Sequence, residues 1–303
     1  MINQLNLKLV KKLLLNKFLK NVENITIKKA DGTLEFFDPS KLISSLQKSG
    51  ATKELCDEVM KQIEKEIQDG MKTSYIYHRA FQILGEKSEP VASRYSLKRA
   101  LSEMGPSGFP FELLISEILK EKGYKTETDL IMNGRCVEHE IDVLAKNEKD
   151  FIICEAKFHN TSGVKSDLKV ALYVDARCKD LAKGNFDGKK PENLSPKYWL
   201  VTNTKFTKNA IIYGRCNGIT MIGWGYPNEG NLQDLLEDLN LLPLTILTNL
   251  TNQEKRILFE QGIILCKSLL ENNELLRKIG IKDIRIERIL REVEGVLKTK
   301  RRP

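Results

Sequence analysis

Hydrophobic and polar positions in the first part of the chain predict a hairpin followed by helices. Two β-rich runs within residues 24–37 flank Asp31-Gly32, a dipeptide that suits the positive φ angles of a tight turn. Hydrophobic residues then recur at helical spacing in four segments, residues 40–49, 53–68, 73–85 and 90–103. One hairpin and four helices of these lengths predict a compact α+β domain.

A cluster of helix-breaking residues separates this part from the next one. Residues 104–110 contain two glycines and two prolines, which cannot continue a helix and therefore mark a domain boundary. Beyond it the pattern predicts helices at 111–123, 165–183 and 205–216 and strands at 126–132, 138–146, 151–158, 197–203 and 219–224. This succession predicts an α/β sandwich around a central mixed sheet.

Residues 231–303 form a third part, in which the pattern is almost entirely helical. It contains two similar glycine turns, Gln261-Gly262-Ile263 and Ile279-Gly280-Ile281. These turns resemble those of helix-hairpin-helix repeats, which bind a DNA backbone through turn amides. Packing between helices or dimerisation accounts for the same hydrophobic residues, and both interpretations stay open.

Composition narrows the class of protein. Hydrophobic residues make up 41% and charged residues 30% of the 303 positions, which excludes fibrous and wholly disordered proteins. No hydrophobic run approaches the roughly 18 residues of a membrane-spanning helix. The net charge of +8 suits a polyanionic partner such as nucleic acid. Residues 101–150 reverse the sign, with eleven acidic against six basic residues, and either a bound cation or ordinary surface variation explains that stretch.

Two further features bear on location. The six cysteines form no C-x-x-C pair, so they are expected to be reduced thiols and not a zinc site or a disulfide framework. Residues 1–20 are hydrophobic but interrupted by five lysines, and they lack the features of a secretory signal. We expect a basic amphipathic helix there that packs on the body of the protein, in preference to a membrane-surface anchor. The predicted location is cytoplasmic, without a membrane partner.

The acidic stretch supplies the first candidate chemistry. Asp142 lies in one predicted strand, and Glu155 and Lys157 lie on one face of the next, because side chains at i and i+2 share a face. A tight turn at residues 147–150 would bring Asp142 near Glu155. Two carboxylates beside a lysine suit Mg²⁺, which takes few protein ligands. Charges that simply face solvent are the alternative, although charges next to the hydrophobic run 151–154 are costly unless they are used.

Residues 108–225 contain further short motifs around these carboxylates. They are Phe111-Glu112, Gly123-Tyr124, Glu140-Ile141-Asp142-Val143, Glu155-Ala156-Lys157, the run from Lys169 to Tyr173, and the run from Trp199 to Thr207. Together they resemble the Mrr-type restriction endonucleases of the PD-(D/E)-x-K nuclease superfamily. The resemblance implies that Asp142 and Glu155 ligate Mg²⁺ or Mn²⁺, that Glu112 supports the metal through water, and that Lys157 assists the attacking water. Lys169 stands where this branch often has glutamine, and it completes the candidate catalytic set. His139 is expected to be structural or a phosphate contact in preference to a metal ligand, and His159 has no assigned role.

The first domain carries a second candidate site. Lys28, Lys29 and Lys41 are close in the predicted hairpin and first helix, where they would cradle a polyphosphate or form a solvated basic surface. The motifs of residues 24–101, from Ile27-x-Lys29-x-Asp31-Gly32 to Leu97-Lys98-Arg99, resemble those of an ATP-cone. The resemblance implies that ATP or dATP is an allosteric ligand held by a specific set of residues: Ile27, Lys29, Glu35, Lys41, Thr73 and Lys98. There is no Walker-type glycine loop, so a nucleotide sensor is expected.

These inferences combine into one functional hypothesis. The chain is divided into a basic helix at 1–20, an ATP-cone at 21–104, an Mrr-like nuclease domain at 105–230 and a helical region at 231–303. We expect a nucleotide-regulated, Mg²⁺-dependent DNA endonuclease, acting in restriction of foreign or modified DNA and assembling as a homo-oligomer. Two alternatives are a DNA-binding regulator that responds to ATP or dATP without cleaving, and a structure-specific nuclease such as a junction resolvase.

Overall fold

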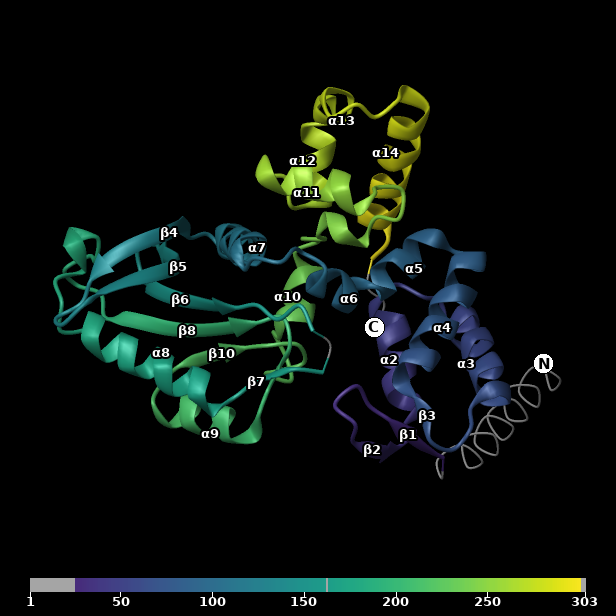
Figure 1. Cartoon of the computed structure of the whole chain (residues 1–303), viewed down its shortest axis with the longest axis horizontal. Coiled ribbons are helices and arrows are strands. Elements are labelled where there is room, and N and C mark those ends of the chain that lie inside the picture. The colour runs from purple at the N-terminus through teal and green to yellow at the C-terminus, as the bar shows by residue number, and fades with distance from the viewer. Residues whose placement is uncertain (1–24, 162, 301–303) are drawn as a thin grey trace, which may run out of the picture. The chain divides into compact units, whose positions relative to one another are not determined.

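The computed structural model describes residues 25–161 and 163–300, so the helix predicted at 1–20 lies outside the described residues (Figure 1). The chain forms two compact units. Of the described residues, one unit contains 25–95 together with 299–300, and the other is Ser96–Lys298. Within the described ranges, no helix combines the length and the hydrophobicity that crossing a bilayer requires.

The first unit is a small mixed α+β structure. Strands β1 (Thr26–Lys28) and β2 (Leu34–Phe36) form the predicted antiparallel hairpin, with Gly32 at a φ of 83° in its turn. The short strand β3 (Met71–Lys72), which the sequence pattern did not predict, adds parallel to β1. The helices are α2 (Pro39–Lys48), α3 (Lys53–Glu66), α4 (Thr73–Lys87) and α5 (Glu89–Tyr95).

The helix predicted at 90–103 is two helices in the structure. It divides at Ser96 into α5 and α6 (Leu97–Ser102). Tyr95 packs in the hydrophobic core of the first unit, whereas Leu97 packs in a core of the second. The helix therefore ends where the chain passes from one core to another, a change that helical spacing alone does not reveal.

A five-stranded mixed sheet organises the second unit, in the order β10-β8-β6-β5-β4. Strands β4 to β6 are antiparallel neighbours, and β6, β8 and β10 are parallel. The strands are β4 (Lys125–Asn133), β5 (Glu138–Lys146), β6 (Phe151–Lys157), β8 (Pro196–Thr202) and β10 (Thr220–Ile222). Two short strands outside this sheet, β7 (Lys165–Ser166) and β9 (Lys205–Phe206), pair with each other and were not predicted.

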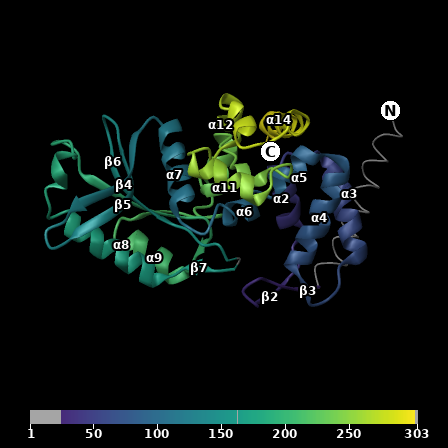
Figure 2. The same cartoon turned by 45° about the horizontal axis from the view of Figure 1, so that its top comes forward.

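Helices cover both faces of this sheet. Helix α7 (Phe109–Glu121) packs on one face, and α8 (Leu168–Leu181) and α9 (Lys208–Cys216) lie side by side on the other (Figures 1 and 2). This layering agrees with the predicted succession of elements. Its assignment to the restriction-endonuclease fold stays a prediction.

The C-terminal helices belong to the same compact unit as the sheet. They are α10 (Leu232–Asp238), α11 (Asn252–Glu260), α12 (Cys266–Glu271), α13 (Glu274–Lys278) and α14 (Asp283–Lys298). Their buried residues share one hydrophobic core with α6, α7 and the α7 face of the sheet. The sequence pattern predicted this region as a separate part. Helical spacing shows which residues are buried, but it does not show that they pack against the sheet domain instead of forming a core of their own.

Candidate functional site

The candidate site lies where strands β5 and β6 separate. Backbone pairing of the two strands runs from Lys146 and Phe151 as far as Val143 and Cys154. Beyond that point, the Asp142 carboxylate takes the place of a backbone partner, because the Ala156 amide donates to Asp142 Oδ2 at 2.7 Å. We call this point the carboxylate fork; it is formed by Asp142 of β5 and Glu155 of β6.

The alternation of side chains along β6 places the charged residues on one face of the sheet. Phe151 and Ile153 pack on the α8 face, whereas Ile152, Cys154 and Ala156 pack on the α7 face. Glu155 and Lys157 therefore belong to the α8 face, as the period of two residues predicts.

Three carboxylates interact at the fork. Burial raises the pKa of Asp142 to about 7, and the negative charges of Glu155 and Glu112 add to this effect, while the bond from Ala156 opposes it. Burial also raises the pKa of Glu112, on α7, to about 7, together with the charges of Glu140, Asp129 and Glu155. Carboxylates that are costly to ionise in the folded protein are typical of sites that bind a cation or transfer a proton.

The shifted carboxylates predict a specific pH dependence for the metal-free protein. Because the pKa of Asp142 is higher in the folded than in the unfolded state, its contribution to stability is fully present below about pH 4 and is lost as pH rises to about 7. The Asp142→Asn variant should lose less stability over this range, with a difference on the order of 1–3 kcal/mol.

Thermal melts in EDTA at pH 5 and pH 8 test this, followed by tryptophan fluorescence. Both tryptophans, Trp199 and Trp224, lie in the second unit, so their signal reports on the unit that contains the fork. The asparagine side chain of the variant keeps an oxygen that can accept from Ala156, so the comparison isolates the charge. Equal loss of stability in both proteins between these pH values would contradict a raised pKa at Asp142.

Asp129 is a residue at this site that the sequence did not single out. It adopts a φ of 55°, an uncommon conformation for a residue other than glycine, between the pairs Thr128–Val143 and Leu130–Ile141. It therefore lies across from Asp142, and its charge contributes to the raised pKa of Glu112. Asp129 is one of many acidic residues in its stretch of the chain, so the sequence did not distinguish it as part of the site.

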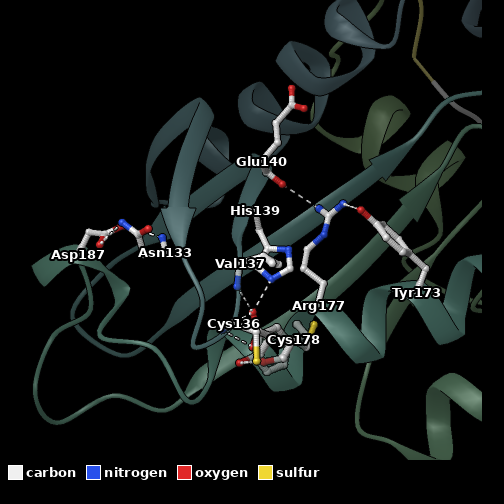
Figure 3. Close-up of polar contacts among 11 residues, drawn as sticks. Asn133, Cys136, Val137, His139, Glu140, Tyr173, Arg177, Cys178 and Asp187 are labelled. Atoms are coloured by element: carbon white, nitrogen blue, oxygen red, sulfur yellow. Dashed lines mark hydrogen bonds and ion pairs between the residues drawn. The ribbon is translucent and has the colours of Figure 1, made fainter.

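Arg177 on α8 is the second residue that sequence reasoning missed. Its guanidinium forms an ion pair with Glu155, and both side chains are largely buried, at 11% and 15% exposure. It also donates to the Glu140 carbonyl oxygen and to the Tyr173 hydroxyl, at 2.9 Å each (Figure 3). Its guanidinium carbon lies 4.8 Å from the centre of the Tyr173 ring. The candidate metal ligand Glu155 is thus neutralised by an arginine from another layer of the unit.

The two histidines near the fork make structural contacts. His139 Nε2 lies 2.9 Å from Asp180 Oδ2 near the end of α8, and the Cys136 and Val137 amides donate to the same carboxylate (Figure 3). These bonds lower the pKa of Asp180 to about 2, and the bond with His139 makes the largest contribution. They hold the β4–β5 connection against α8, so His139 is explained without a ligand.

His159 lies beyond the end of β6. Its backbone is held by both groups of the buried Asn203 side chain, which accepts from the His159 amide at 2.9 Å and donates to its carbonyl oxygen at 2.7 Å. Its ring lies 2.9 Å from the hydroxyl of the buried Ser166. Burial and the nearby charge of Lys157 lower the pKa of His159. This network fixes the segment that carries Lys157.

Lys169 makes none of the described contacts with the residues of the carboxylate fork. It lies in the first turn of α8, where its amide donates to the N-cap residue Asp167 at 3.0 Å. Its side chain is exposed and forms no ion pair with any described residue. The charges of Glu112 and Glu155 contribute to the raised pKa of Asp142, so these three carboxylates lie near one another. The catalytic role of Lys169 stays a prediction.

The described residues offer a metal ion two carboxylates at the fork. Within the described ranges, no group of three or more His, Cys, Asp or Glu side chains is arranged to hold a metal. In Asp142, however, the Ala156 amide donates to Oδ2, and in Glu155 the Arg177 guanidinium donates to Oε2. Each carboxylate therefore has a second oxygen to which the described residues make no hydrogen bond. Two carboxylates with the remaining positions left to water and substrate is a common arrangement for Mg²⁺. The residues therefore fit such an ion in number and chemistry.

The predicted nucleotide site of the first unit is built around Glu35. Lys29 Nζ and Lys41 Nζ lie 2.5 Å and 3.6 Å from Glu35 Oε2, and although burial opposes the effect, the two lysines lower the pKa of Glu35. Buried Ile27 pairs directly with Glu35 across the hairpin. Thr73 begins α4 immediately after Lys72, and Lys72 pairs with Lys28 of β1.

The sixth predicted nucleotide contact, Lys98, lies in the second unit. Its ammonium is 6.0 Å from the Trp224 ring centre, and its side chain is exposed. Five of the six residues thus belong to the first unit.

The C-terminal glycine turns are explained by helix ends. Gly262 and Gly280 have φ angles of 76° and 88°, and their amides donate to Phe259 and Arg277 at the ends of α11 and α13. Ile263 and Ile281 are buried in the shared core. These contacts support the interpretation that the turns serve packing between helices. Their use for DNA binding stays a prediction.

Comparison with known proteins identifies two segments. The family model described as "ATP cone domain" matches residues 25–104, which confirms the predicted ATP-cone, and the one described as "AF1548-like, C-terminal" matches residues 242–297. Neither description names a nuclease, so the resemblance to Mrr-type enzymes stays a prediction.

Two relatives cover a longer part of the chain. A protein of Archaeoglobus fulgidus described as "Uncharacterized protein" is 35% identical over 187 residues, which make up 60% of this chain and 99% of that protein. The solved structure titled "Crystal Structure of Protein of Unknown Function AF1548" is 32% identical, with a TM-score of 0.53, and the similarity covers 63% of this chain and 98% of that one.

Proposed function

The chain belongs to the AF1548-like family, and we propose that it is a nucleotide-regulated, Mg²⁺-dependent DNA endonuclease. The observation that supports this most strongly is the carboxylate fork, where Asp142 and Glu155 meet at the point of strand separation with Glu112 nearby. Burial of such groups is unfavourable for folding, which favours a role in binding or chemistry. The test is Mg²⁺-dependent cleavage of plasmid DNA by the wild type and by Asp142→Asn.

In this proposal each residue of the fork has a defined role. Asp142 and Glu155 would hold Mg²⁺, and Glu112 would support it through a water molecule. The ion would supply charge stabilisation for a phosphodiester under attack. Lys157, on the same face as Glu155, would orient the attacking water and offset negative charge on the phosphate. Asn203 would keep Lys157 in place by clamping the backbone of His159.

DNA as the substrate is supported by charge. The net charge of +8 favours a polyanion, and the basic residues lie mainly outside the acidic stretch that contains Asp142. Restriction of foreign or modified DNA, and a homo-oligomeric state, stay predictions.

Nucleotide regulation is assigned to the ATP-cone. Millimolar ATP or dATP should raise the melting temperature by about 3 °C or more, because a ligand that binds only the folded state stabilises it. The Lys29→Ala variant should lose this shift while its own stability changes little, since the ion pair of Lys29 with Glu35 is partly exposed and such pairs contribute little. Differential scanning fluorimetry measures both effects.

A matched control is Lys87→Ala. Lys87 also forms an ion pair in the first unit, with Glu58 at 2.9 Å, but it is not one of the predicted nucleotide contacts. This variant should keep the nucleotide shift of the wild type. A wild type that shows no shift with either nucleotide would exclude a working sensor.

A second candidate function is favoured by one observation. The ion pair between Arg177 and Glu155 satisfies a carboxylate that a nuclease would need for its metal. That arrangement suits a DNA-binding regulator that responds to nucleotide without cleaving. Binding of DNA with no cleavage in Mg²⁺ or Mn²⁺ would favour this alternative.

A further inference from the structure

We propose that Arg177 is the counter-ion that a divalent metal displaces from Glu155, so that the arginine sets the affinity of the carboxylate fork for metal. This inference rests on the proposed function, because it presumes that Asp142 and Glu155 bind the ion. It assigns a role to a residue outside the predicted catalytic set.

The charges at the fork require such a counter-ion. Asp142 and Glu155 are partly buried carboxylates on neighbouring strands at the point where β5 and β6 separate, so their negative charges repel each other. Arg177 places one positive charge on Glu155, from a side chain that is only 11% exposed. A divalent ion at the same carboxylate would lie next to that guanidinium and be repelled by it. The two cations therefore compete for Glu155.

The surroundings of Arg177 provide a position for it after displacement. Its guanidinium also contacts the Tyr173 hydroxyl and ring and the Glu140 carbonyl oxygen (Figure 3). Arg177 Nε is buried and has no hydrogen-bond partner among the described residues. A small movement could therefore break the pair with Glu155 while the contacts with Tyr173 are kept. The arginine would remain beside the site and would not move into solvent.

The direct test is Mn²⁺ binding by Arg177→Gln, measured by titration calorimetry and by the loss of the free Mn²⁺ signal in electron paramagnetic resonance. Removal of the competing charge should tighten binding about tenfold. The variant should melt at a lower temperature than wild type in EDTA, because Glu155 has lost its partner. It should gain more stability from Mn²⁺ than the wild type does.

Two variants separate competition from a structural role. Lys179→Gln removes a positive charge from the same helix, where Lys179 pairs with Asp175 at 2.6 Å, and should leave Mn²⁺ affinity unchanged. Arg177→Lys keeps the positive charge beside Glu155, and for that reason it should bind Mn²⁺ within about threefold of wild type. If Arg177→Gln does not fold well enough to titrate, a wild-type affinity for Arg177→Lys together with tighter binding by Arg177→Met would support the proposal.

The outcomes distinguish this inference from the proposed function. If Glu155→Gln abolishes Mn²⁺ binding but the neutral Arg177 variants bind as the wild type does, the fork is a metal site and the counter-ion proposal is wrong. If the wild type shows no Mn²⁺ binding that depends on Asp142 and Glu155, both proposals are wrong.

Discussion

Asp142→Asn is expected to reduce Mg²⁺-dependent DNA cleavage by roughly 10³-fold or more, because a metal that stabilises the charged phosphate contributes several kcal/mol to the transition state. The side chain keeps its shape and an oxygen that can accept from Ala156, so the bond at 2.7 Å can persist. The fold should therefore be maintained, and circular dichroism and melting temperature should confirm it. Cleavage is measured as conversion of supercoiled plasmid to nicked and linear forms.

The matched control is Glu138→Gln. Glu138 lies on the same strand, β5, and in the same acidic stretch, but its side chain is exposed. This variant loses the same charge and should cleave at a rate close to that of the wild type. Equal rates for the wild type and Asp142→Asn would remove Asp142 from the metal site.

Glu292→Gln is expected to lower the free energy of unfolding of the second unit by about 3 kcal/mol, or the melting temperature by about 6–12 °C. Glu292, on α14, is 6% exposed. Its two carboxylate oxygens accept from the amides and side chains of Thr248 and Asn249, over distances from 2.6 to 3.0 Å. Glutamine replaces one acceptor with a donor and leaves buried donors without partners.

Urea unfolding followed by tryptophan fluorescence measures this effect. The control is Glu294→Gln on the same helix, because Glu294 forms only an exposed ion pair with Lys298, and a change of less than about 0.5 kcal/mol is expected. Equal stability of the Glu292 and Glu294 variants would show that the bonds to residues 248–249 do not hold the C-terminal helices in place.

Local pattern predicted the elements that carry the site. The bounds of β5 agree with the predicted strand at 138–146, and β6 begins at Phe151 as predicted. The turn between them followed from polar residues at 147–150, and the face shared by Glu155 and Lys157 followed from the period of a strand. Each of these features depends on residues that are close in sequence, which is why a pattern contains them.

Contacts between distant elements could not be predicted in the same way. Arg177 lies 22 positions after Glu155 on an amphipathic helix, and only the packing of α8 on the sheet brings the two together. The left-handed conformation of Asp129 could not be predicted from its residue type, because aspartate adopts this conformation more often than most residues but still at only a minority of its positions. The division at Ser96, which placed Lys98 in the second unit, depends on which core each side chain joins.

The most direct test of the proposed function is cleavage of supercoiled plasmid by the wild-type protein in Mg²⁺, with and without ATP, on methylated and unmethylated DNA. The proposal predicts nicked or linear product that requires Mg²⁺, is abolished by EDTA and changes in rate with ATP. Intact plasmid under every one of these conditions, with Mn²⁺ in place of Mg²⁺ as well, would contradict it.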